Sequence, residues 1–411
     1  MDTSIDTPHR IETPETPIRS RGALLACSGA HVLHDGLSNV LYVLLPIWQG
    51  EFGLSFTEIG LLKTVYSGAL AGLQVPSGYA SERLGESGIL VVGTALAGLG
   101  FLLAGWAGAF VIVGACLALS GAGSSVQHPV SSSLIARQFE GPRLRAALSA
   151  YNFAGDVGKA LLPALAAWAI SLSDWRFTAK ALGAITIAVA LAMVWLLAQL
   201  GRRQPHAAQK SQDATASKGS AWLAGARRGF LALCAIGIVD SATRGGFLVF
   251  LPFLLGEKGA SLTTVGLAMT FVFVGGAAGK FVCGVIANRV GILRTVIITE
   301  CATAAAILML LPLPVTASLM LLPFAGMALN GTSSVLYGTV ADLLPADRRA
   351  RGFGIFYTVG IGASAAAPTI YGVCRDAIGM TPTLVVVAVM VLLVAPLTLP
   401  LRTPLRVVGA A

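Results

Sequence analysis

Twelve long apolar runs dominate this sequence, and each is close to the length of about twenty residues that a helix needs to cross the hydrocarbon core of a bilayer. They cover residues 23–48, 57–81, 88–107, 110–136, 146–170, 177–200, 229–254, 263–287, 293–311, 316–343, 352–375 and 381–401. Charged residues make up only 11% of the chain, whereas soluble domains carry roughly 25%, so they are too few to cover a soluble surface. The sequence therefore predicts an all-α integral membrane protein with twelve transmembrane helices.

Polar segments divide the runs into two sets of six. We expect a cytoplasmic N-terminal tail at 1–22, an N-terminal six-helix bundle at 23–200, a cytoplasmic linker at 201–228, a C-terminal six-helix bundle at 229–401 and a cytoplasmic C-terminal tail at 402–411. Most of the 28 Lys and Arg residues lie in segments that are inside when both termini are cytoplasmic, which is the positive-inside pattern. We therefore expect a multi-pass protein of the bacterial inner (plasma) membrane, embedded in the lipid bilayer. The net charge of +9 follows from this distribution and predicts no nucleic-acid partner.

The two sets of six are related by an internal repeat. Pro46 recurs as Pro252 and Gly60 as Gly266, in both cases 206 positions further along the chain. Matching features in the same order indicate a duplicated six-helix unit. Because both copies begin on the same side, the sequence predicts two parallel bundles related by an axis along the membrane normal.

The segment between the second and third runs, residues 78–85, resembles the signature loop of the major facilitator superfamily, and residues 284–291 repeat it as a weaker match. The duplicated organisation is also similar to that superfamily. The resemblance implies the major facilitator fold and a gating role, through charge contacts between the bundles, for the loop residues Gly78, Glu82, Arg83, Gly85, Gly284, Arg289 and Gly291. The alternative is a pair of tight cytoplasmic turns whose arginines set the topology.

Ionisable side chains within the runs are candidates for function, because a charge at membrane depth costs several kcal/mol unless it faces a cavity or a partner. His31, His34 and Asp35 share one helical face, and His titrates near neutral pH, so this turn predicts a proton relay. The candidates for proton coupling are His31, His34, Asp35, His128 and Asp156. Asp156 is one turn from Lys159, and this pair is alternatively a structural ion pair.

Polar and cationic side chains on the other inward faces predict a substrate site. Cations at depth favour an oxyanion as their partner, so the substrate is expected to be a small organic anion. The candidates for substrate binding are Tyr42, Gln127, Lys159, Asp240, Arg244, Lys280, Asn330, Tyr337 and Tyr357. Asp240 and Arg244 form an alternative structural pair, Lys63 is expected to extend to the membrane surface, and Glu300 is interpreted as structural.

Two stretches resemble the fosmidomycin-resistance efflux family more closely. One begins at residues 31–35 and continues to residues 46–60, and the other covers residues 121–132. The resemblance implies proton-driven export, with His31, Asp35 and His128 at motif positions. The chain departs from the family at Val130, where a carboxylate is usual, and gains Asp156 and Lys159 in the fifth run, which suggests that proton coupling has moved.

The sequence thus predicts a monomeric, proton-coupled secondary active transporter that exports a small anionic organic compound or drug by alternating access. Its partners are the small-molecule substrate and protons. Two alternatives remain open at this point: a proton symporter that imports an organic anion such as a carboxylate or phosphonate, and a divalent metal transporter that uses imidazole ligands. No Walker or HExxH motif is present, so we expect no enzyme, no catalytic residues, no cofactor and no resident metal.

Overall fold

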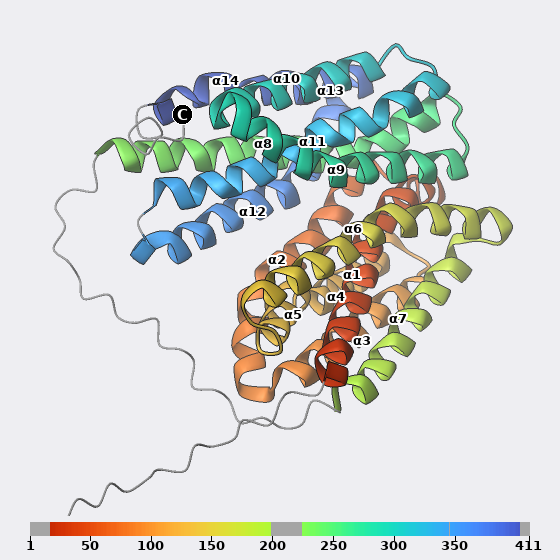
Figure 1. Cartoon of the computed structure of the whole chain (residues 1–411). Coiled ribbons are helices and arrows are strands. Elements are labelled where there is room, and N and C mark those ends of the chain that lie inside the picture. The colour runs from red at the N-terminus through yellow and green to blue at the C-terminus, as the bar shows by residue number, and fades with distance from the viewer. Residues whose placement is uncertain (1–16, 199–223, 345, 403–411) are drawn as a thin grey trace, which may run out of the picture.

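The computed structural model describes residues 17–198, 224–344 and 346–402, and within these residues it is helical, without a β-strand. Figure 1 shows two helical bundles that lie close together on one side of the view and diverge toward the other. The expected N-terminal tail falls almost entirely outside the described residues, as do most of the linker and the C-terminal tail. The first helix of the second bundle begins at Ala224, inside the segment predicted to be a linker.

All twelve predicted spans are present, most of them a few residues longer than the apolar run. The N-terminal bundle contains α1 (Pro17–Phe52), α2 (Phe56–Leu84), α3 (Glu86–Ala104), α4 (Phe110–Ser124), α5 (Gln127–Ala136), α6 (Gly141–Leu172) and α7 (Trp175–Ala198). The C-terminal bundle contains α8 (Ala224–Glu257), α9 (Leu262–Val290), α10 (Ile292–Leu310), α11 (Val315–Leu343), α12 (Ala346–Ile378), α13 (Met380–Leu392), α14 (Val394–Leu397) and the 3₁₀ turn η1 (Leu399–Leu401).

Two of the spans are broken. Helices α4 and α5 together form the fourth span, and α13, α14 and η1 together form the twelfth. Among the residues that the structure describes, ten spans are long and apolar enough to cross a membrane by length and composition. Helices α1 and α2 are long enough but too polar by this measure, because they carry the ionisable residues that the sequence singles out.

The turns confirm the internal repeat at the level of backbone geometry. Gly85 and Gly291, 206 positions apart, have φ angles of 95° and 91°, a region that residues with a Cβ rarely adopt. Ser55 and Ser261, which are related by the same offset, each accept a hydrogen bond from a backbone N–H in the first turn of the following helix, α2 and α9. The duplicated sequence therefore builds the same turns twice.

The two bundles touch through a pair of equivalent helix contacts, α2 against α12 and α9 against α6. The Thr64 hydroxyl donates to the Ala365 carbonyl oxygen at 2.6 Å, and the Thr270 hydroxyl donates to that of Ala160 at 2.5 Å. Gly60 lies against the backbone of Pro368 so closely that a Cβ would clash. Small residues at these crossings let the helix backbones approach.

These contacts lie toward one end of the molecule. We call the end at which α1 and α8 begin the terminal end, and the opposite end, with the α1–α2 and α8–α9 turns, the far end. At the far end the Asp376 carboxylate accepts hydrogen bonds from the backbone N–H groups of Phe56 (2.9 Å) and Thr57 (2.8 Å) at the start of α2. The Arg375 guanidinium lies 3.8 Å from the centre of the Phe56 ring. Within the described residues, hydrogen bonds and ion pairs between the bundles occur only from the far end to mid-depth.

The closed far end predicts an efficient crosslink. The hydroxyl oxygens of Thr64 on α2 and Thr369 on α12 are 2.7 Å apart, so cysteines at both positions will form a disulfide on mild oxidation, because sulfur atoms there fall within bonding reach. Mass spectrometry of the digested protein will detect the linked peptides. The variants Thr64→Cys and Thr369→Cys alone control for the native cysteines. Two reduced, reagent-accessible thiols after oxidation would contradict the arrangement.

Candidate functional site

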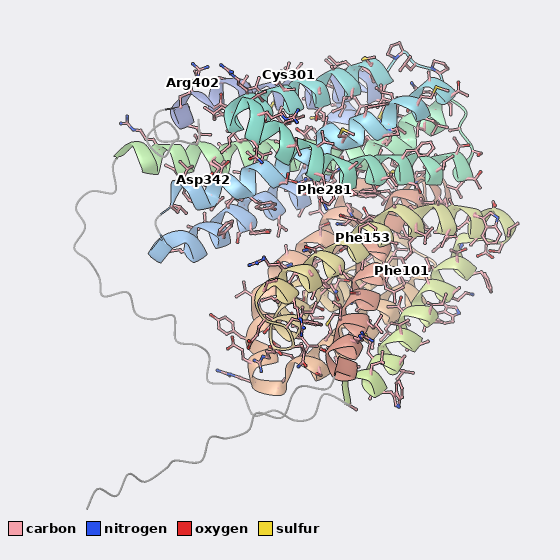
Figure 2. All side chains as sticks on the ribbon, viewed as in Figure 1. Phe101, Phe153, Phe281, Cys301, Asp342 and Arg402 are labelled. Atoms are coloured by element: carbon pink, nitrogen blue, oxygen red, sulfur yellow. The ribbon has the colours of Figure 1, made fainter. Side chains whose placement is uncertain are left out.

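Five ionisable side chains from three helices meet between the bundles near mid-depth. We call them the charge cluster: His31 and Asp35 of α1, Asp156 and Lys159 of α6, and Lys280 of α9. In Figure 2 the labelled Phe153 and Phe281, which are near Asp156 and Lys280 in sequence, mark where α6 and α9 face each other. The sequence predicted all five residues as functional candidates, and the structure brings them together.

The contact between His31 and Asp35 depends on which ring nitrogens of His31 carry a hydrogen. His31 Nδ1 lies 2.8 Å from the carbonyl oxygen of Tyr151, and because a carbonyl only accepts, Nδ1 carries a hydrogen. A neutral ring then presents a lone pair at Nε2, which lies 3.1 Å from Asp35 Oδ2. Two acceptors at this distance repel each other, whereas a proton on Nε2 would let the ring donate to Asp35 Oδ2.

Gly155 of α6 makes room for this contact. A Cβ at that position would come within 2.5 Å of His31 Nε2 and 2.7 Å of Asp35 Oδ2. Any side chain would therefore separate the pair or displace α6 from α1. The sequence did not single out Gly155, and only its position one residue before Asp156 hinted at a role.

Both lysines of the cluster are neutralised by carboxylates. Lys159 Nζ lies 2.9 Å from Asp35 Oδ2 and 3.5 Å from Asp156 Oδ1, so the pairing with Asp156 expected from the sequence is the weaker of its two contacts. Lys280 Nζ lies 2.7 Å from Asp156 Oδ2 and 2.8 Å from its Oδ1. This last ion pair joins the two bundles. A substrate anion at Lys280 therefore has to compete with Asp156.

His34 lies apart from the charge cluster and has two neutral partners. Its Nε2 is 3.0 Å from the Thr94 hydroxyl, which itself donates to the Leu90 carbonyl, and its Nδ1 is 3.0 Å from the Ser124 hydroxyl. Thr94 therefore accepts from Nε2–H, and Nδ1 accepts from Ser124. A neutral imidazole satisfies every partner here, so the geometry gives His34 no need for a second proton.

His128, Gln127 and Tyr151 line the terminal side of the cluster. The His128 and His31 rings meet edge to face with centroids 5.2 Å apart, and Gln127 donates to the Tyr151 hydroxyl at 3.3 Å. Ligand atoms of His31, Asp35 and His128 lie within 4.8 Å of one another, a spacing compatible with a metal. Lys159 already contacts the Asp35 oxygen that such an ion would need, and a cation beside it disfavours a second one.

The remaining substrate candidates lie in the second bundle or between the bundles. Arg244 Nη2 is 3.4 Å from Asp240 Oδ2, so the predicted pair is formed. The Tyr337 and Tyr357 rings stack with centroids 4.6 Å apart. Asn330 Nδ2 donates to the Gly326 carbonyl at 3.1 Å on its own helix, α11. Tyr42 stacks on Phe273 across the two bundles, with centroids 6.5 Å apart.

The expectation for Lys63 is wrong. Instead of reaching the membrane surface, its side chain is 6% exposed and donates to the Ser38 carbonyl oxygen at 2.9 Å. The ammonium also lies 4.6 Å from the centre of the Tyr42 ring and 5.4 Å from that of Tyr66. The ring faces and the carbonyl oxygen carry partial negative charge, and they take the place of water around the ammonium.

The predicted gating loops both lie at the terminal end, after α2 and α9. Glu82, Arg83 and Arg289 are exposed, and no ion pair within the described part of the chain joins them to the opposite bundle. Gly78 and Gly284 have open space at the Cβ position, whereas Gly85 and Gly291 are the positive-φ turn residues. The gating role of all seven loop residues stays a prediction.

Comparisons with known proteins agree with this architecture. The sequence profile described as Major Facilitator Superfamily matches residues 27–242 and 233–409. The solved structure of a bacterial homolog to the human lysosomal transporter Spinster, in an inward-facing and occupied conformation, has a TM-score of 0.77 at 17% identity, covering 95% of this chain and 98% of that one. This likeness establishes a common fold.

Curated relatives include a resistance protein and proteins named as transporters. The fosmidomycin resistance protein of Escherichia coli (strain K12) is 36% identical over 148 residues, which are 36% of this chain and 36% of that protein. An uncharacterized MFS-type transporter of Bacillus subtilis (strain 168) is 25% identical, with 94% of each chain aligned. The gallate transporter of Pseudomonas putida is 26% identical over 80% of each chain.

The two histidines of α1 provide a matched test of the site. His34→Gln should lower the free energy of unfolding by about 1–3 kcal/mol, because buried hydroxyl partners lose an imidazole that satisfies both. The pH dependence of its thermal midpoint should stay that of the wild type. The proton that we propose below for the His31–Asp35 pair predicts that His31→Gln flattens this dependence, because the folded protein then lacks that binding site. Flattening by His34→Gln alone would contradict the assignment.

Proposed function

Since the chain belongs to the Major Facilitator Superfamily, we propose that it is a proton-coupled transporter of a small organic anion, working by alternating access. It is a multi-pass membrane transporter rather than an enzyme. The observation that carries the proposal is the His31–Asp35 contact, which needs a bound proton, at one end of a chain of ion pairs that reaches Lys280 in the opposite bundle. The gallate transporter among the relatives supports an anionic cargo.

The proton changes the net charge of the charge cluster. Asp35 and Asp156 balance Lys159 and Lys280, so the cluster is neutral without the proton and carries one positive charge with it. The protonated cluster therefore attracts an anion more strongly in the low-dielectric interior. Because linkage is reciprocal, a bound anion also strengthens proton binding.

The Lys280–Asp156 bridge connects this chemistry to alternating access. An anion at Lys280 weakens the ion pair that holds α9 to α6 at mid-depth, beyond which the far end is closed by further hydrogen bonds between the bundles. With the terminal end placed in the cytoplasm, as the positive-inside pattern predicts, the described conformation faces inward. Binding of the proton and the anion would then shift the equilibrium between this conformation and one in which the terminal end is closed and the far end is open.

The direction of transport follows from the sign of the coupling. Proton and anion favour the same state of the cluster, so the site geometry best supports symport, in which an inward proton gradient drives uptake of the anion. The second candidate is proton-driven export, which the resemblance to the fosmidomycin resistance protein favours. Export by antiport requires the proton and the cargo to compete, so a cargo that displaces the His31–Asp35 proton would be needed.

Purified protein in lipid vesicles tests both the cargo class and the direction. Gallate and other small organic acids are screened first by thermal shift at two pH values, since a specific ligand stabilises the folded protein. Stronger stabilisation at the lower pH is expected for symport. Transport of the anion under an imposed proton gradient then shows the direction. Symport predicts that the anion accumulates on the side toward which protons flow, and accumulation on the other side would establish antiport.

Charge variants of the bridge test the assigned roles. Lys280→Gln should reduce anion affinity by about tenfold or more, which corresponds to about 1.4 kcal/mol or more for a lost charge-assisted hydrogen bond. Asp156→Asn should tighten anion binding, because it removes the carboxylate that competes for Lys280. The control is Thr270→Ser, which lies on α9 like Lys280 and retains the side-chain hydroxyl. Normal transport and affinity in both charge variants would refute an anion site at this bridge.

A further inference from the structure

A second group of buried ionisable residues lies in the C-terminal bundle, away from the charge cluster. Asp240 of α8 and Glu300 of α10 are 4% and 3% exposed, and their carboxyl groups are close enough to interact electrostatically. We call them the carboxyl pair. The sequence assigned Asp240 to substrate binding and Glu300 to structure, and the two helices come near each other because both pack against α11 and α13.

The carboxyl pair has too little positive charge around it for two ionised groups. Arg244 is its one ion-pair partner within the described residues, at 3.4 Å from Asp240 Oδ2, and the same guanidinium nitrogen also donates to Ser241 at 3.3 Å. The Thr332 hydroxyl near Glu300 donates to Thr299 at 2.7 Å instead, and Glu300 Oε1 is buried and receives no hydrogen bond from any described donor. A second unpaired carboxylate in this environment would cost several kcal/mol.

Among the described residues, no other cationic side chain of the neighbouring helices forms an ion pair with the carboxyl pair. The titratable groups that face the pair are Arg244 on α8 itself, Cys283 on α9, Tyr337 on α11, with Tyr357 of α12 stacked on Tyr337, and Tyr42 on α1, which faces Arg244. Helices α13 and α14 and the turn η1 carry no titratable side chain. Each of these neighbours other than Arg244 is neutral in its ordinary protonation state.

We propose that Asp240 and Glu300 share one buried proton, so that the carboxyl pair is a second proton-binding site of this protein. Asp240 lies against Arg244 and stays ionised, and the protonated Glu300 donates a hydrogen bond to it. The pair and the guanidinium are then neutral as a group. Loss of the proton would place two carboxylates side by side and force α8 and α10 apart. This inference does not depend on the cargo or on the direction of transport.

The proton can be observed directly by infrared spectroscopy of the purified, lipid-reconstituted protein. A protonated carboxylic acid has a carbonyl stretching band that a carboxylate lacks. The Asp35→Asn background removes any contribution from the His31–Asp35 pair. In that background we expect a protonated carboxyl band near neutral pH that shifts in D₂O, and Glu300→Gln should abolish it. Retention of the full band in Glu300→Gln, or its absence before mutation, would overturn the proposal.

Thermal stability gives an independent measurement. The unfolded protein releases the Glu300 proton at neutral pH, so the folded state with its proton becomes less favourable as the pH rises. The thermal midpoint of the Asp35→Asn protein should therefore fall by several degrees from about pH 6 to about pH 9. Added Glu300→Gln should remove most of that fall, because a neutral amide donates the same hydrogen bond at every pH.

Control variants keep the result interpretable. Glu300→Asp retains an acid and should retain both the band and the pH dependence. Thr299→Ser, the neighbouring change on α10, should leave both unaltered. If Glu300→Gln fails to fold, the band of the Asp35→Asn protein is followed from about pH 6 to about pH 9; disappearance at the higher pH supports the site. A band that is absent throughout means that both carboxylates are ionised, which contradicts the proposal.

Discussion

An ionised side chain inside a membrane protein is stable only beside an opposite charge or with a bound proton, and this constraint organises the centre of the molecule. In the charge cluster each lysine lies against a carboxylate, and His31 Nε2 lies beside the Asp35 carboxylate. The helices that carry these residues, α1, α6 and α9, belong to both bundles. Compensation of charge is therefore also what fixes one bundle against the other at mid-depth.

The fold could be predicted almost completely from the sequence, because hydropathy and the repeat report on local properties. A run of about twenty apolar residues has few structural options in a bilayer, and the glycines at 85 and 291 mark equivalent turns whatever the rest of the chain does. The resemblance to the major facilitator superfamily, confirmed by the match over residues 27–242 and 233–409, rested on these same features. The broken spans were not predicted, since α4 and α5 form one continuous apolar run.

Candidate residues could be predicted, whereas their partners could not. Lys159 and Asp156 are one turn apart, so their pairing was expected, but the shorter contacts of both go to Asp35 and Lys280 on other helices. Lys280 and Asp156 are separated by 124 positions and by the division between the bundles. The position of Lys63 was predicted wrongly because the sequence does not reveal its partners. In the structure the ammonium lies against the Tyr42 and Tyr66 rings and the Ser38 carbonyl oxygen. Partner choice depends on tertiary packing, which hydropathy does not encode.

The contacts between the bundles at the far end have a different character, because residues of the repeat make them twice. Thr64 on α2 reaches Ala365 on α12, and Thr270 on α9 reaches Ala160 on α6. Each bundle thus offers one donor helix and one acceptor helix, as both partners do in an isologous interface. A single six-helix copy would be self-complementary through this surface. The architecture is therefore that of a symmetric homodimer with joined subunits, in which His31, Asp35 and Asp156 of the charge cluster all lie in the N-terminal half.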